Sequence, residues 1–272
     1  MGMRIWHQSF TVLGQLPPYA AALAAHFRKV ARPDTEVVMH GMHDKTYQTN
    51  YPGTDIRHAY MQYLHGQQFV LGGVLAEEQG FDAYAIMTIP EPALRETRSL
   101  IDIPVVAYGE SSYLASMMLG QKVGVLLFID EMAPIIRENA ERVIPAQRFA
   151  GARPVGFTFN DVLKAFDEPA PLIEKFKASA RALIADGADV IVPGEAPLCV
   201  LLAKNGVSRV DDVPIVDALG ATIKMAEAMV DLRCSSGLAP SRRGYFMDKP
   251  PRARVKELLE FYGIARLAPG KS

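Results

Sequence analysis

The sequence predicts an α/β protein with two similar parallel-sheet halves, and a repeated segment is the main evidence. Residues 187–197 read GADVIVPGEAP, a short apolar run rich in Val and Ile and bounded by Gly and Pro. Such a run suits a strand that is covered on both faces in a parallel sheet. Residues 80–90, GFDAYAIMTIP, repeat the order of Gly, any residue, Asp and five further residues, ending on Thr88 where the other copy has Glu195. Because ligands bind at the carboxyl ends of parallel strands, both side chains are expected to face a ligand cleft.

The repeat extends beyond the strand. Residues 103–106 (IPVV) follow the first copy at about the distance at which residues 213–216 (VPIV) follow the second. A repeat of this length indicates duplication of a whole strand-helix-strand unit, which would place the two strand ends opposite one another. The alternative is that Gly-x-Asp before an apolar strand is a common helix-to-strand turn, and that the likeness arose by chance.

Apolar periodicity, with Gly, Pro and polar residues as breaks, predicts the other elements in chain order. Strands are expected within residues 3–11 and at 36–39, 105–106, 122–127 and 213–216. Helices are expected at 19–30, at 55–79, after Pro92, from 108 onward, at 132–143, at 171–184, after Glu195, at 217–232 and at 252–262. Residues 157–167 are rich in turn formers and are expected to form a link.

The composition excludes several classes of function. The 272 residues are 49% hydrophobic, enough for one sizeable core or two modest ones. The formal net charge of -1, with acidic and basic residues intermixed, provides no basic stripe for a nucleic acid. No apolar run is long enough to span a bilayer, and the first residues do not resemble a secretory leader, so no membrane partner and a cytoplasmic location are expected.

The two cysteines, Cys199 and Cys234, form no C-x-x-C pair and have no His at a ligand spacing. Neither a disulfide framework nor a zinc site is therefore expected. Cys199 lies one helical turn after Glu195, so it could lean toward the same pocket. The alternative is a small buried hydrophobe, which is the commoner role of a free cysteine.

Residues 40–55 (HGMHDKTYQTNYPGTD) form an unusually long polar and aromatic connection for a compact α/β domain. Long connections of this kind are often lids or binding segments. If the segment closes over the cleft, His43 and Tyr47 are candidates for contact with a substrate. A surface insertion without a role is the equally weighted alternative.

Two further corners of the predicted sheet carry polar residues. Residues 108–112 (YGESS) open a helix, where the hydroxyls of Ser111 and Ser112 and the free amides suit a carboxylate, with helix capping as the alternative. Glu91, between Pro90 and Pro92, is expected to cap the helix that follows it.

These residues resemble the aspartate/glutamate/hydantoin racemase superfamily over most of residues 3–233. The family pattern of Asp-Ala, apolar strand, catalytic Cys, Asp-Pro-x-Leu and a later Arg is similar to Asp82-Ala83, Thr88, residues 91–94 (EPAL) and Arg98. Its second pattern, Gly-Ala-Asp-Val-Ile-Val-x-Gly-Cys-Ala-Gly, is similar to residues 187–197, with Glu195 at the Cys position. Both positions of the family's catalytic thiols therefore hold other residues.

The resemblance implies two pseudo-symmetric, flavodoxin-like domains with the active site in the cleft between them. It implies that Gln8 and Ser9, after the first strand, contact the substrate, and that neither a metal nor another cofactor is needed. The expected divisions are a first domain of residues 1–106 plus 217–234, a second of residues 107–216, and an extension of residues 235–272 with one helix.

The family racemases place a thiol on each side of a substrate carbon, and this chain lacks both. Thr88 is not appreciably ionised near neutral pH, so we expect it to donate a hydrogen bond to a substrate oxygen. Glu195 can act as a general acid/base if burial raises its pKa from an ordinary value of about 4.3. The expected activity is one-sided proton transfer, of the isomerase type, on a small carboxylate or cyclic amide.

Three alternatives stay open. Glu195 would also serve a hydrolase, by activating water, or a decarboxylase or other lyase, by protonating an intermediate. A chain without both thiols is also what a non-catalytic ligand-binding protein would show, although an acid is costly to bury without a purpose. The apolar stripe of residues 252–262 would cover either its own domain or a second subunit, and a homo-oligomer is expected.

Overall fold

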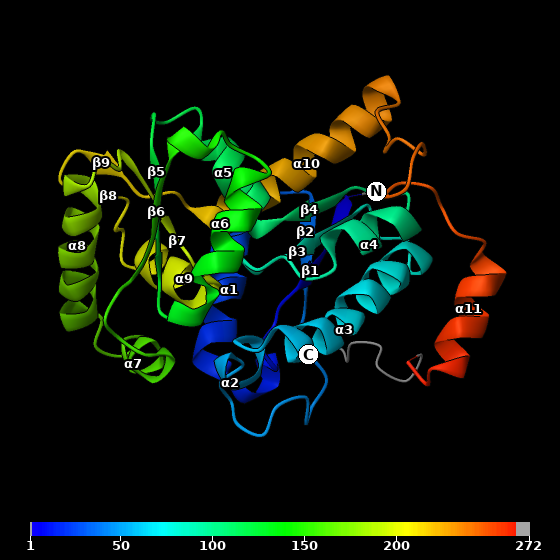
Figure 1. The fold of residues 1–272 in the computed structure, drawn as a ribbon, viewed down its shortest axis with the longest axis horizontal. Helices are drawn as coiled ribbons and strands as arrows, with labels where there is room; N and C mark the ends of the chain where they lie inside the picture. Colours follow the sequence, from blue (N-terminus) through cyan, green and yellow to red (C-terminus); the bar gives the residue numbers. More distant parts are fainter. Residues whose placement is uncertain (1, 265–272) are drawn as a thin grey trace.

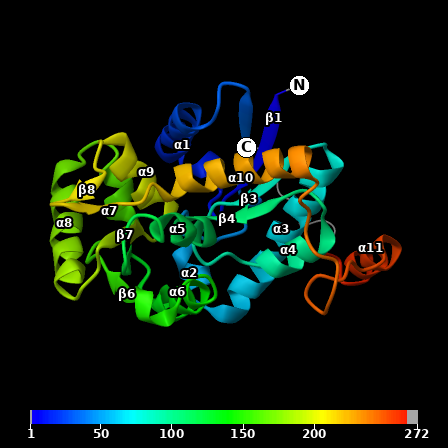
Figure 2. The same cartoon turned by 90° about the horizontal axis from the view of Figure 1, so that it is seen from above.

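The computed structural model describes residues 2–264, so residue 1 and residues 265–272 of the predicted extension lie outside the described residues. A first parallel sheet has the strand order β2-β1-β3-β4. Its strands are β1 Met3–Gln8, β2 Thr35–His40, β3 Ala83–Ile86 and β4 Val105–Ala107. Two pairs of helices cover it, α3 Ala59–Glu78 with α4 Leu94–Leu100 on one face and α1 Pro17–Val30 with α10 Ala218–Ser236 on the other (Figure 2).

A second parallel sheet has the order β6-β5-β7. Its strands are β5 Val123–Leu127, β6 Phe149–Pro154 and β7 Val190–Pro193. Around it lie α5 Tyr108–Ser116, α6 Ala133–Glu141, α8 Ala170–Ala185 and α9 Ala196–Lys204, with α8 on the side away from the first sheet (Figure 1). The two parallel sheets confirm the predicted α/β class, while the predicted domain limits stay a prediction.

The repeated Gly-x-Asp segment performs the same task in both halves. Asp82 accepts a hydrogen bond from the backbone N–H of Arg4 at 2.7 Å, at the start of the central strand β1. Asp189 accepts one from the N–H of Lys122 at 2.7 Å, next to the start of the central strand β5. Each Asp therefore aligns the strand that follows it with the middle of its own sheet, so that the two strand ends emerge at equivalent places.

The halves differ at their edges. β4 pairs with β3 over three residues, whereas Ile215 forms only an isolated parallel bridge to Ile191. The preceding residues instead form a short antiparallel pair, β8 Arg209–Val210 with β9 Val213–Pro214. The predicted strand at 213–216 is therefore reduced to the end of this hairpin and one bridge.

Two predicted elements are wrong in detail. The helix expected at 55–79 is divided into α2 Gly53–Ile56 and α3, because Arg57 and His58 lie between them and His58 is extended. The link expected at 157–167 contains a helix, α7 Phe159–Lys164. Thr158 and Asp161 form a capping box at its start, a short-range helix signal that the turn-rich composition obscured.

The C-terminal segment lies against the first sheet's side of its own chain, with α11 Arg252–Phe261 beyond α3 and α4 (Figure 1). The guanidinium of Arg242 donates to the carbonyl oxygen of Arg98 at 2.8 Å and pairs with Asp102 at 2.6 Å. Lys249 also pairs with Asp102. These contacts fasten the segment that leads to α11, through an arginine that looks like part of a solvated turn in the sequence.

Three short 3-10 helices complete the described residues: η1 Leu13–Gln15, η2 Asp130–Met132 and η3 Ala146–Arg148. No helix within residues 2–264 is both long and apolar enough to cross a membrane.

Candidate active site

Glu195 occupies the N-cap position of α9, directly after β7. The preceding Gly194 donates its N–H to the carbonyl oxygen of Leu126 at 2.7 Å, which brings the ends of β7 and β5 close together. A Cβ atom on Gly194 would lie 2.9 Å from that oxygen and 3.1 Å from the Cβ of Leu127. Glycine at this position therefore lets the strand end approach β5, and the Glu195 side chain reaches across the end of that strand.

Two backbone amides hold one oxygen of the Glu195 carboxyl group. Oε1 accepts hydrogen bonds from the N–H of Phe128 at 2.9 Å and from the N–H of Ile129 at 3.1 Å. Oε2 is buried and has no hydrogen-bond partner within residues 2–264. The carboxyl group is thus fixed by one oxygen while the other is left for a ligand or a proton.

Burial raises the pKa of the Glu195 carboxyl from its ordinary value of 4.5 to about 8. The amide hydrogen bonds from Phe128 and Ile129 oppose this rise, and the charge of nearby Asp130 adds to it. Glu195 is only 7% exposed, so loss of hydration is the largest cause of its raised pKa. A carboxyl group with a pKa near neutrality can both accept and return a proton at physiological pH.

Thr88 and Glu195 line the same small cavity, of about 50 Å³. Four further hydroxyl-bearing residues also line it: Ser9, Thr11, Tyr19 and Tyr51. Apolar walls come from both halves and include Met87 and Phe128. Within the part of the chain that the structure describes, the lining includes no Lys, Arg or His, and Glu195 is its only carboxylic acid.

The roof of the cavity comes from the long connection between β2 and α3. Tyr51, Pro52, Gly53 and Ile56 all line the cavity. The Tyr51 ring stacks on Phe159 of α7, with the ring centroids 5.1 Å apart and the planes at 19°. The segment therefore reaches from the first sheet's side to a helix beside the second sheet.

The structure brings three of the predicted site residues together and places five elsewhere. Ser9, Thr88 and Glu195 line the cavity, whereas Gln8, His43, Tyr47, Ser111 and Ser112 do not. Ser9 is also engaged locally, because its hydroxyl lies 2.8 Å from that of Thr11.

The five other side chains have identifiable surroundings. Gln8 donates to the carbonyl oxygens of Ser9 and Gly41, both at 3.2 Å, and Tyr47 donates to that of Phe10 at 2.7 Å. The His43 backbone N–H donates to Gln68 at 2.9 Å, in a separate surface hollow. Ser112 donates to the Tyr108 carbonyl within α5, and Ser111 is buried in the same helix. Gln8 and Tyr47 therefore fix the strand ends and the connection instead of facing the cavity.

Sequence reasoning missed several cavity residues, above all Tyr51 and Phe159. Tyr51 lies in the connection that was expected to be a lid or a surface insertion, eight residues after His43. Its signal is the run Tyr51-Pro52-Gly53, because Pro and Gly mark a tight turn that fixes a neighbouring side chain. Phe159 follows the Thr158 cap, so the capping box of α7 would have placed it at a helix start.

Cys199 fits the alternative of a small buried hydrophobe. It is 2% exposed, and burial raises the pKa of its thiol to about 12. The thiol lies 3.9 Å from Asp217 on the far side of α9's first turn and does not line the cavity of Glu195. A thiol held in this protonated form is a poor nucleophile.

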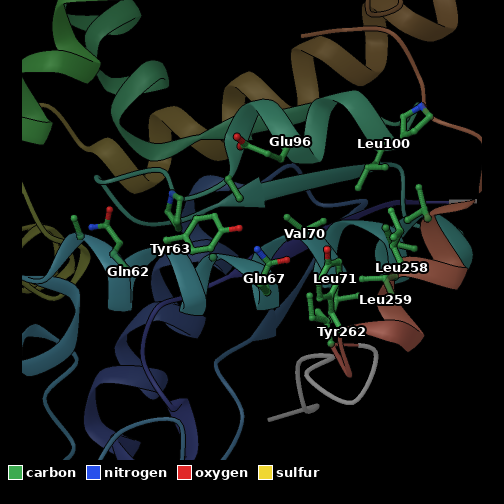
Figure 3. A pocket seen from close by; sticks show the side chains of 18 residues that line it. Gln62, Tyr63, Gln67, Val70, Leu71, Glu96, Leu100, Leu258, Leu259 and Tyr262 are labelled. Atoms are coloured by element: carbon green, nitrogen blue, oxygen red, sulfur yellow. The ribbon is translucent and has the colours of Figure 1, made fainter. Parts of the chain in front are cut away.

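A wider groove of about 540 Å³ lies between α3, α4 and α11 (Figure 3). Leu71 of α3 lies beside Leu258 and Leu259 of α11 at one end of the groove, and Tyr63 lies toward the other end. It contains none of the predicted site residues, and Glu96 is the only acid among its described lining residues. No group of three or more His, Cys, Asp or Glu side chains suited to a metal ion occurs within residues 2–264.

Comparisons with known proteins find related sequences. A family model described as Asp/Glu/Hydantoin racemase matches residues 19–226. A hydantoin racemase of Pseudomonas sp. (strain NS671) is 26% identical over 208 residues, which make up 75% of this chain and 78% of that protein.

Solved structures extend the likeness to the fold. An allantoin racemase from Klebsiella pneumoniae has a TM-score of 0.74 and 23% identity, with 92% of this chain and 94% of that chain covered. An allantoin racemase from Pseudomonas fluorescens has a TM-score of 0.73 and 25% identity, with 92% and 98% covered. The fold of these two enzymes therefore extends over nearly the whole chain.

Proposed function

Because this chain belongs to the Asp/Glu/hydantoin racemase family, we propose that it is a cofactor-independent isomerase that moves a proton on a small cyclic amide. Glu195 is the general acid/base in this proposal, and Thr88 is the hydrogen-bond donor to a substrate oxygen. Membership of the family and a racemase-like enzyme were both expected from the sequence, and the family match confirms them. The reaction, its residues and its substrate are the proposal.

One observation carries it: Glu195 is the only carboxylic acid of a cavity shared with Thr88, and its Oε2 has no partner within the described chain. A buried carboxyl oxygen without a partner is costly unless a ligand or a proton satisfies it. The pKa of about 8 that burial gives this group supports a role in accepting and returning protons near neutral pH.

The lining favours a cyclic amide over a carboxylate. A bound carboxylate needs a cation or several free amides, and the described lining has no Lys, Arg or His. The amides of Phe128 and Ile129 are already taken by Glu195. A neutral ring with carbonyl and N–H groups suits hydroxyl partners better, and hydantoin and allantoin, named in the relatives, are rings of this kind.

In the proposed reaction the Glu195 carboxylate removes the proton from a ring carbon that is bonded to a carbonyl group. Negative charge then develops on the carbonyl oxygen, where a hydrogen bond from the Thr88 hydroxyl stabilises it. Return of the proton by Glu195 restores the original configuration. Delivery of a proton by water from the opposite face inverts it, and the hydroxide ion left behind then takes the proton held by Glu195, which restores the carboxylate.

The test is incubation with single enantiomers of 5-methylhydantoin and of allantoin in deuterated water. We expect deuterium at the ring carbon of at least one compound, faster than in an enzyme-free control, and loss of this label incorporation in Glu195→Gln. A ring-opened product would instead identify a hydrolase. Binding of these rings without exchange, by a folded protein, would contradict the enzyme and support a binding protein.

A further inference from the structure

The cavity around Glu195 is too small for a substrate to pass through unaided. Its volume of about 50 Å³ corresponds to roughly four water molecules at about 10–15 Å³ each. Cavities that enclose small-molecule ligands are commonly about 300–1,000 Å³. Some part of the wall must therefore move when a ligand enters or leaves.

The connection of residues 41–52, between β2 and α2, is a long segment without strand or helix that contributes Tyr51 and Pro52 to the wall. One contact at its far end and one just beyond α2 join this part of the chain to the second half of the molecule. Tyr51 stacks on Phe159 of α7, and Arg57 forms an ion pair with Glu131. The Arg57 and Glu131 side chains are 47% and 43% exposed, so this pair contributes little, and the stack is the stronger contact.

The position of the Tyr51 ring depends on Gly53. A Cβ atom on Gly53 would lie 2.1 Å from Cζ and 2.3 Å from the hydroxyl oxygen of Tyr51. The hydroxyl end of the ring therefore lies close to the backbone of Gly53, and the ring stacks on Phe159. Its hydroxyl group has no hydrogen-bond partner among residues 2–264, so packing and not hydrogen bonding determines its place.

We propose that Tyr51 is a positioning residue whose ring, stacked on Phe159, holds residues 41–52 closed over Glu195 and keeps water from the carboxyl group. This inference rests on the proposed function of Glu195. It assigns residues 41–52 as a lid, and it assigns Gly53 and Phe159 as the residues against which the Tyr51 ring packs. The lid then controls how strongly the carboxyl group holds its proton.

The surroundings of Glu195 support this dependence. The titratable groups around it are Tyr51 from the lid, Tyr19 from α1, Asp130 from η2 and Tyr108 from α5. Burial raises the pKa of each tyrosine, so all three are neutral near neutral pH, and of these groups only the charge of Asp130 raises the pKa of Glu195. Loss of hydration is the largest cause of its raised pKa. Because no cation among residues 2–264 offsets this loss, water that enters on opening of the lid must lower the pKa of Glu195.

The first measurement is hydrogen-deuterium exchange of the ligand-free protein, which needs no turnover. Tyr51→Ala is expected to raise exchange in residues 41–58 by about tenfold, since it removes an aromatic contact that closes the segment. Tyr60→Ala is the matched control, because Tyr60 stacks on Tyr63 at 6.4 Å and 19° but is 71% exposed at the start of α3 and does not line the cavity. Tyr51→Phe keeps the ring and is expected to exchange like the wild type.

The second measurement is the titration of Glu195 by carbon-13 NMR of labelled glutamate carboxyl groups, with Glu195→Gln assigning the signal. Tyr51→Ala and Gly53→Ala are expected to lower the Glu195 pKa by about one unit or more, because both expose the carboxyl group to water. Tyr60→Ala leaves it unchanged. Gly53→Ala keeps all aromatic side chains, so it decides the matter if Tyr51→Ala is poorly folded.

Unchanged exchange and unchanged titration in Tyr51→Ala and Gly53→Ala would overturn the lid. So would a Tyr60→Ala variant with the same changes. If neither ring compound is turned over, the proposed function fails while these two measurements still decide on the lid, so that the two failures are distinguishable.

Discussion

The ends of β3 and β7 descend from the same sequence pattern, yet they carry acids with different surroundings. After β7 the chain enters α9 at once, with Glu195 as the N-cap. After β3 it passes Thr88 and makes a detour in which Glu91 and Ala93 have φ angles of 50° and 55° before α4 begins. The first end therefore displays a hydroxyl group to the cavity and turns its acid away.

The pKa of Glu91 is raised as far as that of Glu195. Burial raises its pKa to about 8, opposed by the backbone amide of Glu110 and by the charge of Arg98. Its Oε1 accepts the N–H of Glu110 at 2.6 Å, so it caps α5 and not α4, the helix that the sequence predicted. It does not line the cavity of Glu195.

The comparison shows that a raised pKa alone does not locate an active site. Glu91 and Glu195 have the same raised pKa of about 8 and the same kind of amide anchor. Of the two acids, only Glu195 also lines a cavity and has a buried carboxyl oxygen without a hydrogen-bond partner among residues 2–264. The left-handed backbone at Glu91 is strained for a non-glycine residue and serves to hold the loop that carries Thr88.

The largest expected effect separates these two acids by activity. Glu195→Gln is expected to lower the rate of deuterium exchange on the ring compounds by about 10²–10⁴-fold, since it removes the acid/base group. Glu91→Gln, the matched control, is expected to retain activity within about threefold, because its amide can still occupy the cap. Steady-state rates for both purified variants check this, and equal losses in both would remove the distinction.

The same two acids are expected to act alike on stability. Each titrates at about 8 in the folded protein against 4.5 ordinarily, so the folded state binds more protons between these pH values. Stability therefore falls as pH rises through this window, by about 1.4 kcal/mol per pH unit for each acid, and levels off above the folded pKa.

Glu91→Gln and Glu195→Gln should each remove the contribution of one acid to the dependence of stability on pH. Urea unfolding between pH 5 and pH 9 measures it, with the double variant expected to show the flattest profile. A Glu91→Gln protein that keeps the full wild-type slope would show that Glu91 is ionised throughout.

The glycine before the acid marks a second contrast between the strand ends. Gly194 has Met87 as its counterpart in the first copy, and both donate their N–H to the neighbouring strand. A Cβ atom at Gly194 meets backbone at 2.9 Å, so Gly194→Ala is expected to cost about 1–3 kcal/mol of stability. Met87→Ala is also expected to lower stability, because removal of the side chain leaves a cavity. Thermal unfolding with and without 5-methylhydantoin compares the two variants. Gly194→Ala should weaken binding of the ring more than Met87→Ala, because it displaces Glu195, whereas Met87→Ala removes one apolar contact of the cavity wall.

The sequence was sufficient for the parts of the molecule that local pattern controls. The two Gly-x-Asp runs predicted the strands β3 and β7, because the apolar pattern of a buried strand is local. They also predicted that Thr88 and Glu195 face one cleft, and both residues line the same cavity. It was insufficient where tertiary contacts choose between similar residues. His43, Tyr47 and Tyr51 are all polar aromatics of one connection, and only packing on Gly53 and Phe159 brings Tyr51 to the cavity.

The cap formed by Glu91 was missed for a related reason. Its position between Pro90 and Pro92 suggested that it caps α4, the next helix in the sequence. The left-handed turn instead directs its side chain to the start of α5, the helix that follows α4. Short-range signals predict that a residue caps a helix, but the fold decides which one.

The smallest expected effect concerns Thr88 itself. Thr88→Val keeps the shape of the side chain and removes the hydroxyl group, so activity is expected to fall by about tenfold, the value of one hydrogen bond to a developing charge. Thr88→Ser keeps the donor and is expected to stay within about threefold of the wild type. The loss should fall on kcat and not on KM, because the charge develops only in the transition state. Thr88→Val with wild-type kcat would leave Glu195 as the sole catalytic group and reduce the first strand end to a wall of the cavity.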